Sequence, residues 1–330
     1  MKAISLIEPY ATLIKNNQKK IETRSWKTTY RGELLIHASK AKTPKEWQNN
    51  KELMNLLDAP ISSYGQIVCK CKLVDCIKMT KEYIDKIKVE KPIEYFCGIY
   101  KEGRYAWVLE DIKPITPPLY AKGNLNIWEW SKEKQLEDIL RKSNKIMTIL
   151  EVLQNYSQKN PSFKNYYLAA GAINQTIFNY FHNNPLDKNI GDFDIVYYDE
   201  NTSYEKEDEI IKDLEKTLQN LKVKLDIKNE CRVPIWLKEN YNREILPYKS
   251  VEDAISRWGT TVTCIGVRLE NNNFKIYSPY GLDDLFSLTI RPVKIDFNEM
   301  DYMKKTEKWR AKWPKLTIIP WNVSNESSKE

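Results

Sequence analysis

The chain has 330 residues, of which 52 are lysine or arginine and 45 are aspartate or glutamate, so its formal net charge is +7. Its length is typical of two domains, and its 42% hydrophobic content excludes a disordered or fibrous protein. The longest apolar runs are too short to cross a bilayer, and the first residues have no signal-peptide pattern. We therefore expect a cytoplasmic protein without membrane association.

The positive charge is concentrated in the first half of the chain. Residues 1–150 contain 27 basic and 18 acidic side chains, whereas residues 151–330 contain 25 and 27. A basic half is typical of proteins that bind a polyanion such as RNA, although a solvated lysine-rich surface gives the same imbalance. Charge alone leaves both interpretations open.

The six cysteines do not have the spacing of a zinc site. Cys69 and Cys71 are two residues apart in a strand-like run, which places them on one face of a strand. Zinc sites instead use paired Cys-x-x-Cys or Cys/His ligands, and the chain has only two histidines. We therefore expect buried, reduced thiols.

The first 130 residues have the pattern of a small mixed β-barrel. Three strand-like runs, GELLIHA, GQIVCKCKLVDCIKM and RYAWVLEDIKPI, are separated by turn residues. A short helix is expected over residues 9–17 and a polar helical stretch over residues 44–57.

After Ser131 the pattern changes to alternating helices and strands. Apolar residues at helical spacing predict one helix that starts at an N-cap on Ser131 and ends before Asn160 and Pro161. The elements expected next are the strand YYLAAG, a helix over residues 172–181, the strand DFDIVYYD, a helix over residues 204–220 and the strand VKLDIKN. This alternation predicts a mixed α/β domain.

The predicted fold class is therefore α+β, with two domains. The expected domains cover residues 1–131 and 132–321. The polar residues 322–330 are expected to form a disordered tail.

Asp192 and Asp194 begin the strand DFDIVYYD. Because side chains alternate along a strand, both carboxylates point to one face and Phe193 points to the core. Asp226 alternates with apolar residues in the same way and can supply a third carboxylate from a neighbouring strand. Such carboxylates hold the divalent cations of phosphoryl- and nucleotidyl-transfer enzymes. The pattern therefore favours a site for Mg²⁺ or Mn²⁺.

Gly171 ends the strand YYLAAG and begins the next helix. Backbone N–H groups at such a helix start can hold phosphate oxygens. A strand–glycine–helix turn is weak evidence by itself. Here it precedes the two aspartates and the third acidic strand, and the three features support one another.

Residues 140–320 resemble the nucleotidyltransferase head domains of the DNA polymerase β superfamily, especially those of tRNA nucleotidyltransferases. More closely, they resemble an uncharacterised bacterial nucleotidyltransferase-like family. The resemblance is carried by AAGAI, DFDIVYYD, DIKNECRV, PYKSVEDAISRW, TTVTCIGVRL, SPYGLDDLFSLTIRP and KWRAKWPKL. It implies that an NTP is the substrate and that Asp192, Asp194 and Asp226 are catalytic metal ligands.

The candidate nucleotide contacts near these motifs are Gly171, Ala172, Asn174, Lys228, Asn229 and Arg232. The chain departs from the family at Asn174, where an arginine is expected. This departure concerns one phosphate or acceptor contact and leaves the carboxylates unaffected. A solvated strand end is the alternative for Lys228, and a turn is the alternative for Asn229.

Several other polar and aromatic residues have structural interpretations. Asp283 and Asp284 are expected at a helix start, where acidic side chains offset the helix dipole. His182 lies in a loop and is expected to have no catalytic role. Trp309 and Trp313, four residues apart, are expected to anchor a helix in the core.

The first 130 residues resemble the ASCH domain, a relative of the PUA fold found in RNA-associated proteins. EPYATLI, IETRSW, YRGELLIHAS and KGNLNIW carry this resemblance, which implies a cleft for nucleic acid or nucleotides on a β-barrel. The candidate cleft residues are Lys19, Lys20, Glu22, Arg24, Trp26, Tyr30, Arg31 and His37. The cations would meet phosphate and the aromatic rings would stack on bases; a packed core position is the alternative for Trp26 and His37.

Some small ASCH proteins hydrolyse N4-acylated cytidine with a lysine, a threonine and a glutamate. KKIETR places Lys19 at the lysine but Glu22 where the nucleophilic threonine stands, and Thr23 is expected on the opposite strand face.

The carboxylate pattern and the two resemblances together favour a two-metal nucleotidyltransferase with an RNA acceptor. A catalytically inert RNA- or nucleotide-binding protein is the first alternative, and an N4-acylcytidine amidohydrolase is the second.

Overall fold

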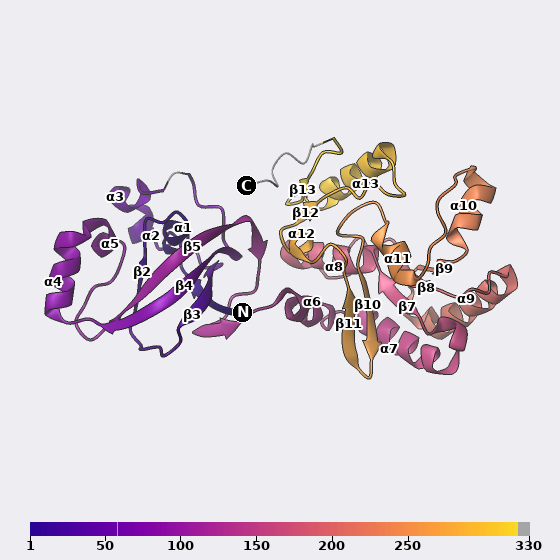
Figure 1. Ribbon diagram of the computed structural model, residues 1–330, viewed down its shortest axis with the longest axis horizontal. Coiled ribbons are helices and arrows are strands. Elements are labelled where there is room, and N and C mark those ends of the chain that lie inside the picture. Colours follow the sequence, from indigo (N-terminus) through magenta and orange to yellow (C-terminus); the bar gives the residue numbers. More distant parts are fainter. Residues whose placement is uncertain (58, 323–330) are drawn as a thin grey trace. The chain divides into compact units, whose positions relative to one another are not determined.

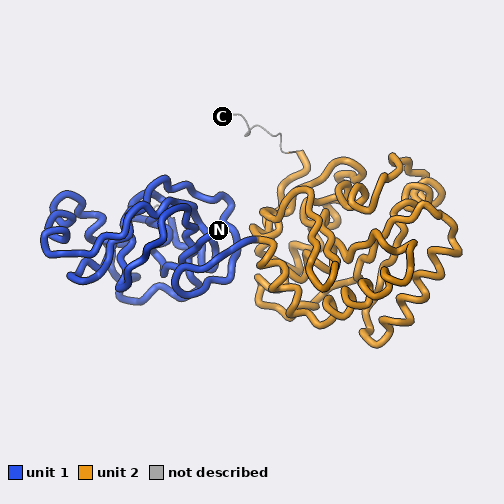
Figure 2. Tube along the Cα trace, turned by 60° about the horizontal axis from the view of Figure 1, so that its bottom comes forward, with its two compact units in different colours: residues 1–131 blue, residues 132–330 orange. Residues whose placement is uncertain are grey.

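The computed structural model describes residues 1–57 and 59–322, and the chain divides into two compact units, Met1–Ser131 and Lys132–Glu330 (Figure 1; Figure 2). Both units combine helices with sheets, so the predicted α+β class is confirmed. Of the tail that is expected to be disordered, residues 322–330, all but the first residue lie outside the described residues. Among the described helices, none combines the length and the hydropathy needed to cross a bilayer.

The first unit is built around a six-stranded sheet with the order β2-β5-β4-β3-β1-β6. Its strands are β1 (Lys2–Leu6), β2 (Ile21–Arg24), β3 (Gly32–Ala38), β4 (Gln66–Lys78), β5 (Tyr105–Tyr120) and β6 (Ile127–Glu129). The pairing between the long strands β4 and β5 shifts register at three points, and such bulges bend a sheet. The predicted barrel therefore has the form of a strongly curved sheet (Figure 1).

The helices of the first unit are α1 (Tyr10–Lys15), α2 (Lys45–Gln48), α3 (Lys51–Met54), α4 (Lys81–Glu90) and α5 (Pro92–Phe96). The first three lie inside the two predicted helical stretches. α4 and α5 were not predicted, although the sequence marks where both begin. The Thr80 hydroxyl accepts the N–H of Tyr83 as the N-cap of α4, and Pro92 is the first residue of α5.

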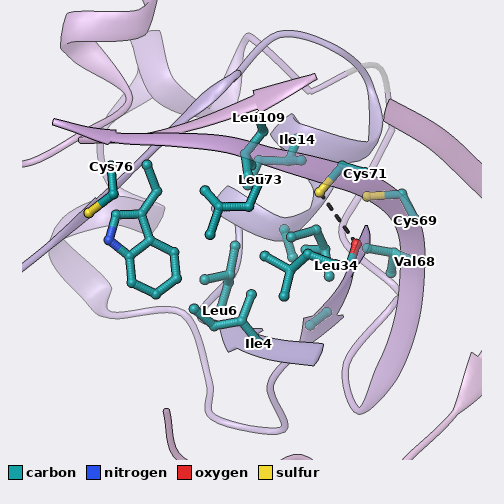
Figure 3. Packing of buried hydrophobic residues seen from close by; sticks show 14 residues of the cluster. Ile4, Leu6, Ile14, Leu34, Val68, Cys69, Cys71, Leu73, Cys76 and Leu109 are labelled. Carbon is teal, nitrogen blue, oxygen red and sulfur yellow. Dashed lines mark hydrogen bonds between the residues drawn. The ribbon is translucent and has the colours of Figure 1, made fainter. Parts of the chain in front are cut away.

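The core of the first unit lies between the curved sheet and α1, and it includes the predicted thiols (Figure 3). Cys69 and Cys71 are both buried in this core beside Leu34, whose carbonyl accepts a hydrogen bond from the Cys71 thiol at 3.4 Å. All six cysteines are free, and five of them are buried. The expectation of buried, free thiols holds for these five, whereas Cys231 is half-buried.

The second unit contains a five-stranded sheet with the order β11-β10-β7-β8-β9. Its strands are β7 (Tyr166–Ala169), β8 (Phe193–Tyr197), β9 (Leu225–Asn229), β10 (Gly266–Glu270) and β11 (Asn273–Tyr277); β12 (Thr289–Ile290) and β13 (Thr317–Ile318) form a separate pair. β8 and β9 run parallel, and the helix α9 connects them, as a parallel connection requires.

The helices of the second unit surround this sheet (Figure 1). They are α6 (Lys132–Leu140), α7 (Asn144–Lys159), α8 (Gly171–Phe181), α9 (Tyr204–Leu218), α10 (Val233–Tyr241), α11 (Val251–Ser256), α12 (Asp283–Phe286) and α13 (Glu299–Lys312), with short 3₁₀ turns at Pro161–Phe163 and Gln219–Leu221. As predicted, Asp283 and Asp284 begin a helix, α12.

The prediction of a single long helix after Ser131 is wrong. The chain instead forms α6 and α7, separated by a turn at residues 141–143. The Ser143 hydroxyl accepts the N–H of Ile146, which starts a new helix at that point. The apolar spacing conceals the break because the apolar faces of both helices are buried.

Two tryptophans tie α13 and the segment after it to α8. Trp309 and Trp313 both contact the ring of Phe178, and Trp313 Nε1 donates to Asn179 Oδ1 at 2.8 Å. This confirms their predicted role as core anchors. His182, at the end of α8, accepts the N–H of Lys315 at 3.0 Å, so it too has a structural role.

Candidate active site

A cavity of about 300 Å³ lies over one face of β8 and β9, beside the start of α8. We call it the carboxylate cavity because all three predicted aspartates line it. The parallel register places Asp194 directly opposite Asp226, and Asp192 immediately precedes β8. Phe193, between the first two, is buried as predicted. Strand pairing thus brings together carboxylates that are more than thirty residues apart in the sequence.

Asp194 lies in a strongly negative environment. Burial, together with the charges of Asp192 and Asp226, raises the pKa of Asp194 to about 6. Lys305 and the Gly171 N–H, which donates to Asp194 Oδ2 at 3.1 Å, oppose this rise. The three carboxylates are therefore close enough to repel one another, and a cation among them would relieve the repulsion.

Two lysines bring positive charge to the carboxylate cavity. Lys228 Nζ donates to Asp226 Oδ2 at 2.7 Å; burial lowers the pKa of Lys228, but this bond and the charge of Asp226 outweigh burial, and the pKa rises. Lys305 reaches the cavity from α13, and burial lowers its pKa against the charge of Asp194. Sequence reasoning missed Lys305 because no local motif links it to the acidic strands.

Glu230 is a fourth carboxyl group at this cavity, and sequence reasoning missed it as well. It follows Asp226 and Lys228 at intervals of two residues, so all three can face the same side of the chain. Its side chain is only 3% exposed, and burial raises its pKa to about 8. Glu230 is therefore mostly protonated at neutral pH, and it adds little to the negative charge of the site.

The start of α8 approaches the carboxylates through its backbone. Ala170 adopts φ 44° and ψ −117°, a conformation that costs a residue other than glycine on the order of 1–3 kcal/mol. Gly171 follows, and a Cβ there would lie 2.8 Å from Gln175 Nε2 and 3.3 Å from Asp194 Oδ2. A side chain at this position would displace the Gln175 amide and crowd the Asp194 carboxylate.

The other predicted nucleotide contacts lie outside the lining of the carboxylate cavity. Ala172 is buried, and so is Asn174, whose amide donates to the Val262 carbonyl at 3.3 Å. The side chain of Asn229 donates to the backbone carbonyls of Asp199 and Asn201 and accepts the N–H of Cys231, so it holds the chain together at the end of β9. Arg232 pairs with Glu207.

As they stand, the described residues contain no group of three or more His, Cys, Asp or Glu side chains placed to hold a metal ion. Each aspartate has a separate partner: Asp194 bonds to the backbone of Gly171, Asp226 to Lys228, and Asp192 to Lys224 at 3.5 Å. The chemistry of the set nevertheless fits Mg²⁺ or Mn²⁺, which prefer carboxylate oxygens. A cation would compete with these partners for the carboxylate oxygens.

The first unit has its own cavity, of about 470 Å³, beside β2. Four of the eight predicted cleft residues line it: Lys19, Glu22, Arg24 and Trp26. The charges in this cavity are paired, since Glu22 lies 3.6 Å from Lys19 Nζ and 3.1 Å from Arg24 Nε. Thr23, which alternation predicts on the opposite face, also lines the cavity, and its hydroxyl accepts the N–H of Ile99.

The other four predicted cleft residues lie outside the lining of that cavity. Lys20 is exposed, the Tyr30 hydroxyl donates to the Glu33 carbonyl, and Arg31 pairs with Asp75. His37 is buried, with its ring nitrogens 3.1 Å from Ser5 Oγ and 3.3 Å from the Ala121 carbonyl, and burial lowers its pKa to about 4. This is the packed position given as its alternative.

Each of the two units contains a segment that matches a protein-family model. Residues 4–119 match the model of the ASCH domain, and residues 158–318 match a family described as nucleotidyltransferase. The chain joins an ASCH domain to a nucleotidyltransferase domain. Both resemblances drawn from the sequence are confirmed, and the carboxylate cavity belongs to the nucleotidyltransferase domain.

Three solved structures to which the chain is similar each cover a part of it. One, described as revealing a CCA-adding enzyme head domain, is 24% identical and covers 57% of this chain and 95% of its own, with a TM-score of 0.46. ASCH from Zymomonas mobilis is 16% identical and covers 42% of this chain and 93% of its own; a point mutant is 15% identical and covers 42% and 95%, and both have a TM-score of 0.27. No curated protein matches the chain.

Gly171→Ala should weaken NTP binding, because the added methyl group occupies the space between the α8 backbone and Asp194. We expect a loss of about 10-fold or more in affinity, measured by equilibrium titration with a fluorescent NTP analogue. Gly191→Ala is the matched control, since a Cβ there meets nothing within 4 Å, and its affinity should change less than about 2-fold. Equal losses in both variants would contradict this role of Gly171.

Asp194→Asn should stabilise the protein at neutral pH. Between the unfolded value of 3.8 and about 6, folded Asp194 keeps a proton that the unfolded state has lost, so its contribution to stability falls as pH rises through this window. We expect the free energy of unfolding of the variant to be about 1–3 kcal/mol higher than that of the wild type at pH 7. At pH 4 the two values should be nearly equal. Urea unfolding in EDTA measures this difference.

Asp187→Asn is the control for this pH series. The hydrogen bond from Lys145 lowers the pKa of Asp187, so its contribution to stability is present at neutral pH and is lost on acidification. Its variant should therefore show the opposite trend, with a small amplitude because the pair is exposed. A gain in Asp194→Asn that does not change between pH 4 and pH 7 would contradict the assignment.

Proposed function

We propose that this protein transfers a nucleotidyl group from an NTP to a hydroxyl group of an RNA acceptor, and that the reaction takes place in the carboxylate cavity. The observation that carries the proposal is the position of Asp192, Asp194 and Asp226 on one cavity wall, in a domain of a nucleotidyltransferase family. Burial raises the pKa of Asp194, and the charges of Asp192 and Asp226 raise it further, which supports the same grouping.

The reaction forms a bond between the acceptor oxygen and the α-phosphorus of the NTP. The bond from that phosphorus to the oxygen bridging to the β-phosphate breaks, and pyrophosphate leaves. The hydroxyl proton passes to a carboxylate at the cavity, for which we assign Asp226. Asp226 can take this role once its carboxylate is released from Lys228.

Asp192, Asp194 and Asp226 are the residues that would hold Mg²⁺ or Mn²⁺. When bound, such an ion neutralises triphosphate charge and stabilises the charge that develops during transfer. Release of the carboxylates from their partners also frees two donors, the Gly171 N–H and the Lys228 ammonium. Both donors suit phosphate oxygens, so these partners of the carboxylates become contacts for the NTP.

Lys305 supplies a third donor, and a second positive group, to the same cavity from α13. Its ammonium lies 5.1 Å from the centre of the Trp309 ring, and Trp309 is itself anchored on α8. This anchoring fixes the direction of a long side chain and reduces the entropy lost when it meets a phosphate. We assign Lys305 to the triphosphate.

The RNA part of the proposal rests on the first unit. This unit matches the ASCH domain, carries the excess of positive charge, and has a cavity lined by Arg24 and Trp26. Arginine and tryptophan together suit a phosphate and an unstacked base. The pairing of Arg24 with Glu22 means that RNA has to compete with this carboxylate for the guanidinium.

Incubation of the full-length protein with each labelled NTP, Mg²⁺ and total cellular RNA tests the proposal. We expect RNA to be labelled from at least one NTP, and Asp192→Asn, Asp194→Asn and Asp226→Asn each to reduce labelling by about 100-fold or more. Asp187→Asn, an exposed carboxylate paired with Lys145, is the matched control and should retain activity.

Two results would overturn the proposed transfer. Labelling that persists in all three aspartate variants would contradict the assigned site. No labelling from any NTP, with RNA binding retained, would favour the inert binding protein. If the protein labels no RNA but releases the acyl group from N4-acetylcytidine, the result would instead favour the amidohydrolase.

A further inference from the structure

A second cavity, of about 290 Å³, adjoins the carboxylate cavity at the edge strand β9, between α9 and α10. We call it the side groove. Lys228 and Val233 line both cavities. A ligand in the side groove would therefore lie next to an NTP in the carboxylate cavity, separated from it by these two side chains.

The side groove has an apolar floor and two aromatic rings in its walls. Ile211 of α9 and Ile227 of β9 form the floor. Tyr204 at the start of α9 and Trp236 on α10 contribute the rings, which are 65% and 43% exposed. Exposed rings beside an apolar slot are the arrangement on which proteins stack the bases of single-stranded nucleic acids.

One wall of the side groove is polar and rigid. Glu207 accepts the N–H of Asn229 at 2.8 Å and also pairs with Arg232. The Arg232 guanidinium lies 5.4 Å from the centre of the Tyr204 ring. The wall thus presents a carboxylate acceptor and a planar group of donors, which suit the hydrogen-bonding edge and the face of a base.

We propose that the side groove binds the terminal base of the acceptor, so that the ribose hydroxyl of the same nucleotide enters the carboxylate cavity past Lys228. This inference rests on the proposed function. The volume of the groove is at the low end of the roughly 300–1,000 Å³ of small-molecule sites, which suits one nucleoside and is too small for a protein segment. Asn229 and Arg232, predicted as nucleotide contacts, then serve the acceptor instead of the NTP.

Photo-crosslinking of the full-length protein without NTP tests this assignment. One arm uses a short oligoribonucleotide with 4-thiouridine at its 3′ end, and the other uses free 4-thiouridine. We expect the oligoribonucleotide to crosslink to peptides that contain Tyr204 or Trp236, and the yield to fall about 10-fold or more in the Tyr204→Ala, Trp236→Ala double variant. Crosslinking by both probes would mean that the base alone is recognised, and crosslinking by the oligoribonucleotide alone would mean that the RNA end is recognised.

Two variants control for folding and for loss of surface apolar area. Trp236→Phe keeps an aromatic ring and should keep the crosslink. Ile235→Ala removes an exposed apolar side chain from the same helix, outside the groove lining, and should also keep it. Crosslinks that map only to other peptides, or that persist in the double variant, would overturn the proposal. The proposal would also be overturned if no crosslinks formed and the double variant had an altered oligomeric state. That result would assign the groove to a second copy of the chain.

Kinetics separate this inference from the proposed function. If RNA is labelled, the double variant should raise KM for RNA about 10-fold and change KM for the NTP less than about 2-fold. Labelling with an unchanged KM for RNA would overturn the side-groove proposal alone. Crosslinks in the groove without any labelling would overturn nucleotidyl transfer and leave the groove as a nucleoside-binding site.

Discussion

The negative charges of Asp192, Asp194 and Asp226 repel one another at the carboxylate cavity, and much of the second unit compensates for this repulsion. The groups that offset the charges of Asp194 and Asp226 come from three different elements: the Gly171 N–H at the start of α8, Lys228 on β9, and Lys305 on α13. None of these groups is adjacent in sequence to the first two aspartates. The site therefore depends on contacts that hold α13 against α8, above all the packing of two tryptophans on Phe178.

Strand β9 connects the two binding regions because its side chains alternate. Asp226 and Lys228, with Glu230 just after the strand, line the carboxylate cavity, whereas Ile227 and Asn229 line the side groove together with Lys228. One short edge strand thus separates the place proposed for the NTP from the place proposed for the acceptor. The ammonium of Lys228 lies at the boundary, where attack on the α-phosphorus would occur.

The sequence predicted the parts of this site that depend on local periodicity. Alternation along two strands was enough to group the three aspartates, because the order of elements left few ways to pair those strands. Lys305 could not be found in this way, since only the packing of α13 brings it to the cavity. Motif reasoning also does not reveal where a side chain points: the position of Asn174 in the family pattern suggests a ligand contact, and the structure places its side chain in the core, where it donates to the Val262 carbonyl. In the first unit, Arg24 at the end of β2 and Trp26 two residues later line the cavity, whereas His37 on β3 is buried against Ser5 and the Ala121 carbonyl.

A crystal structure of the protein with Mn²⁺ and an NTP analogue that cannot be cleaved between the α- and β-phosphates tests the central claim most directly. The account predicts anomalous density for Mn²⁺ in contact with Asp192, Asp194 and Asp226, with Lys228 moved from Asp226 to the triphosphate. Manganese bound elsewhere, or Asp226 still paired with Lys228 while the nucleotide is bound, would contradict it.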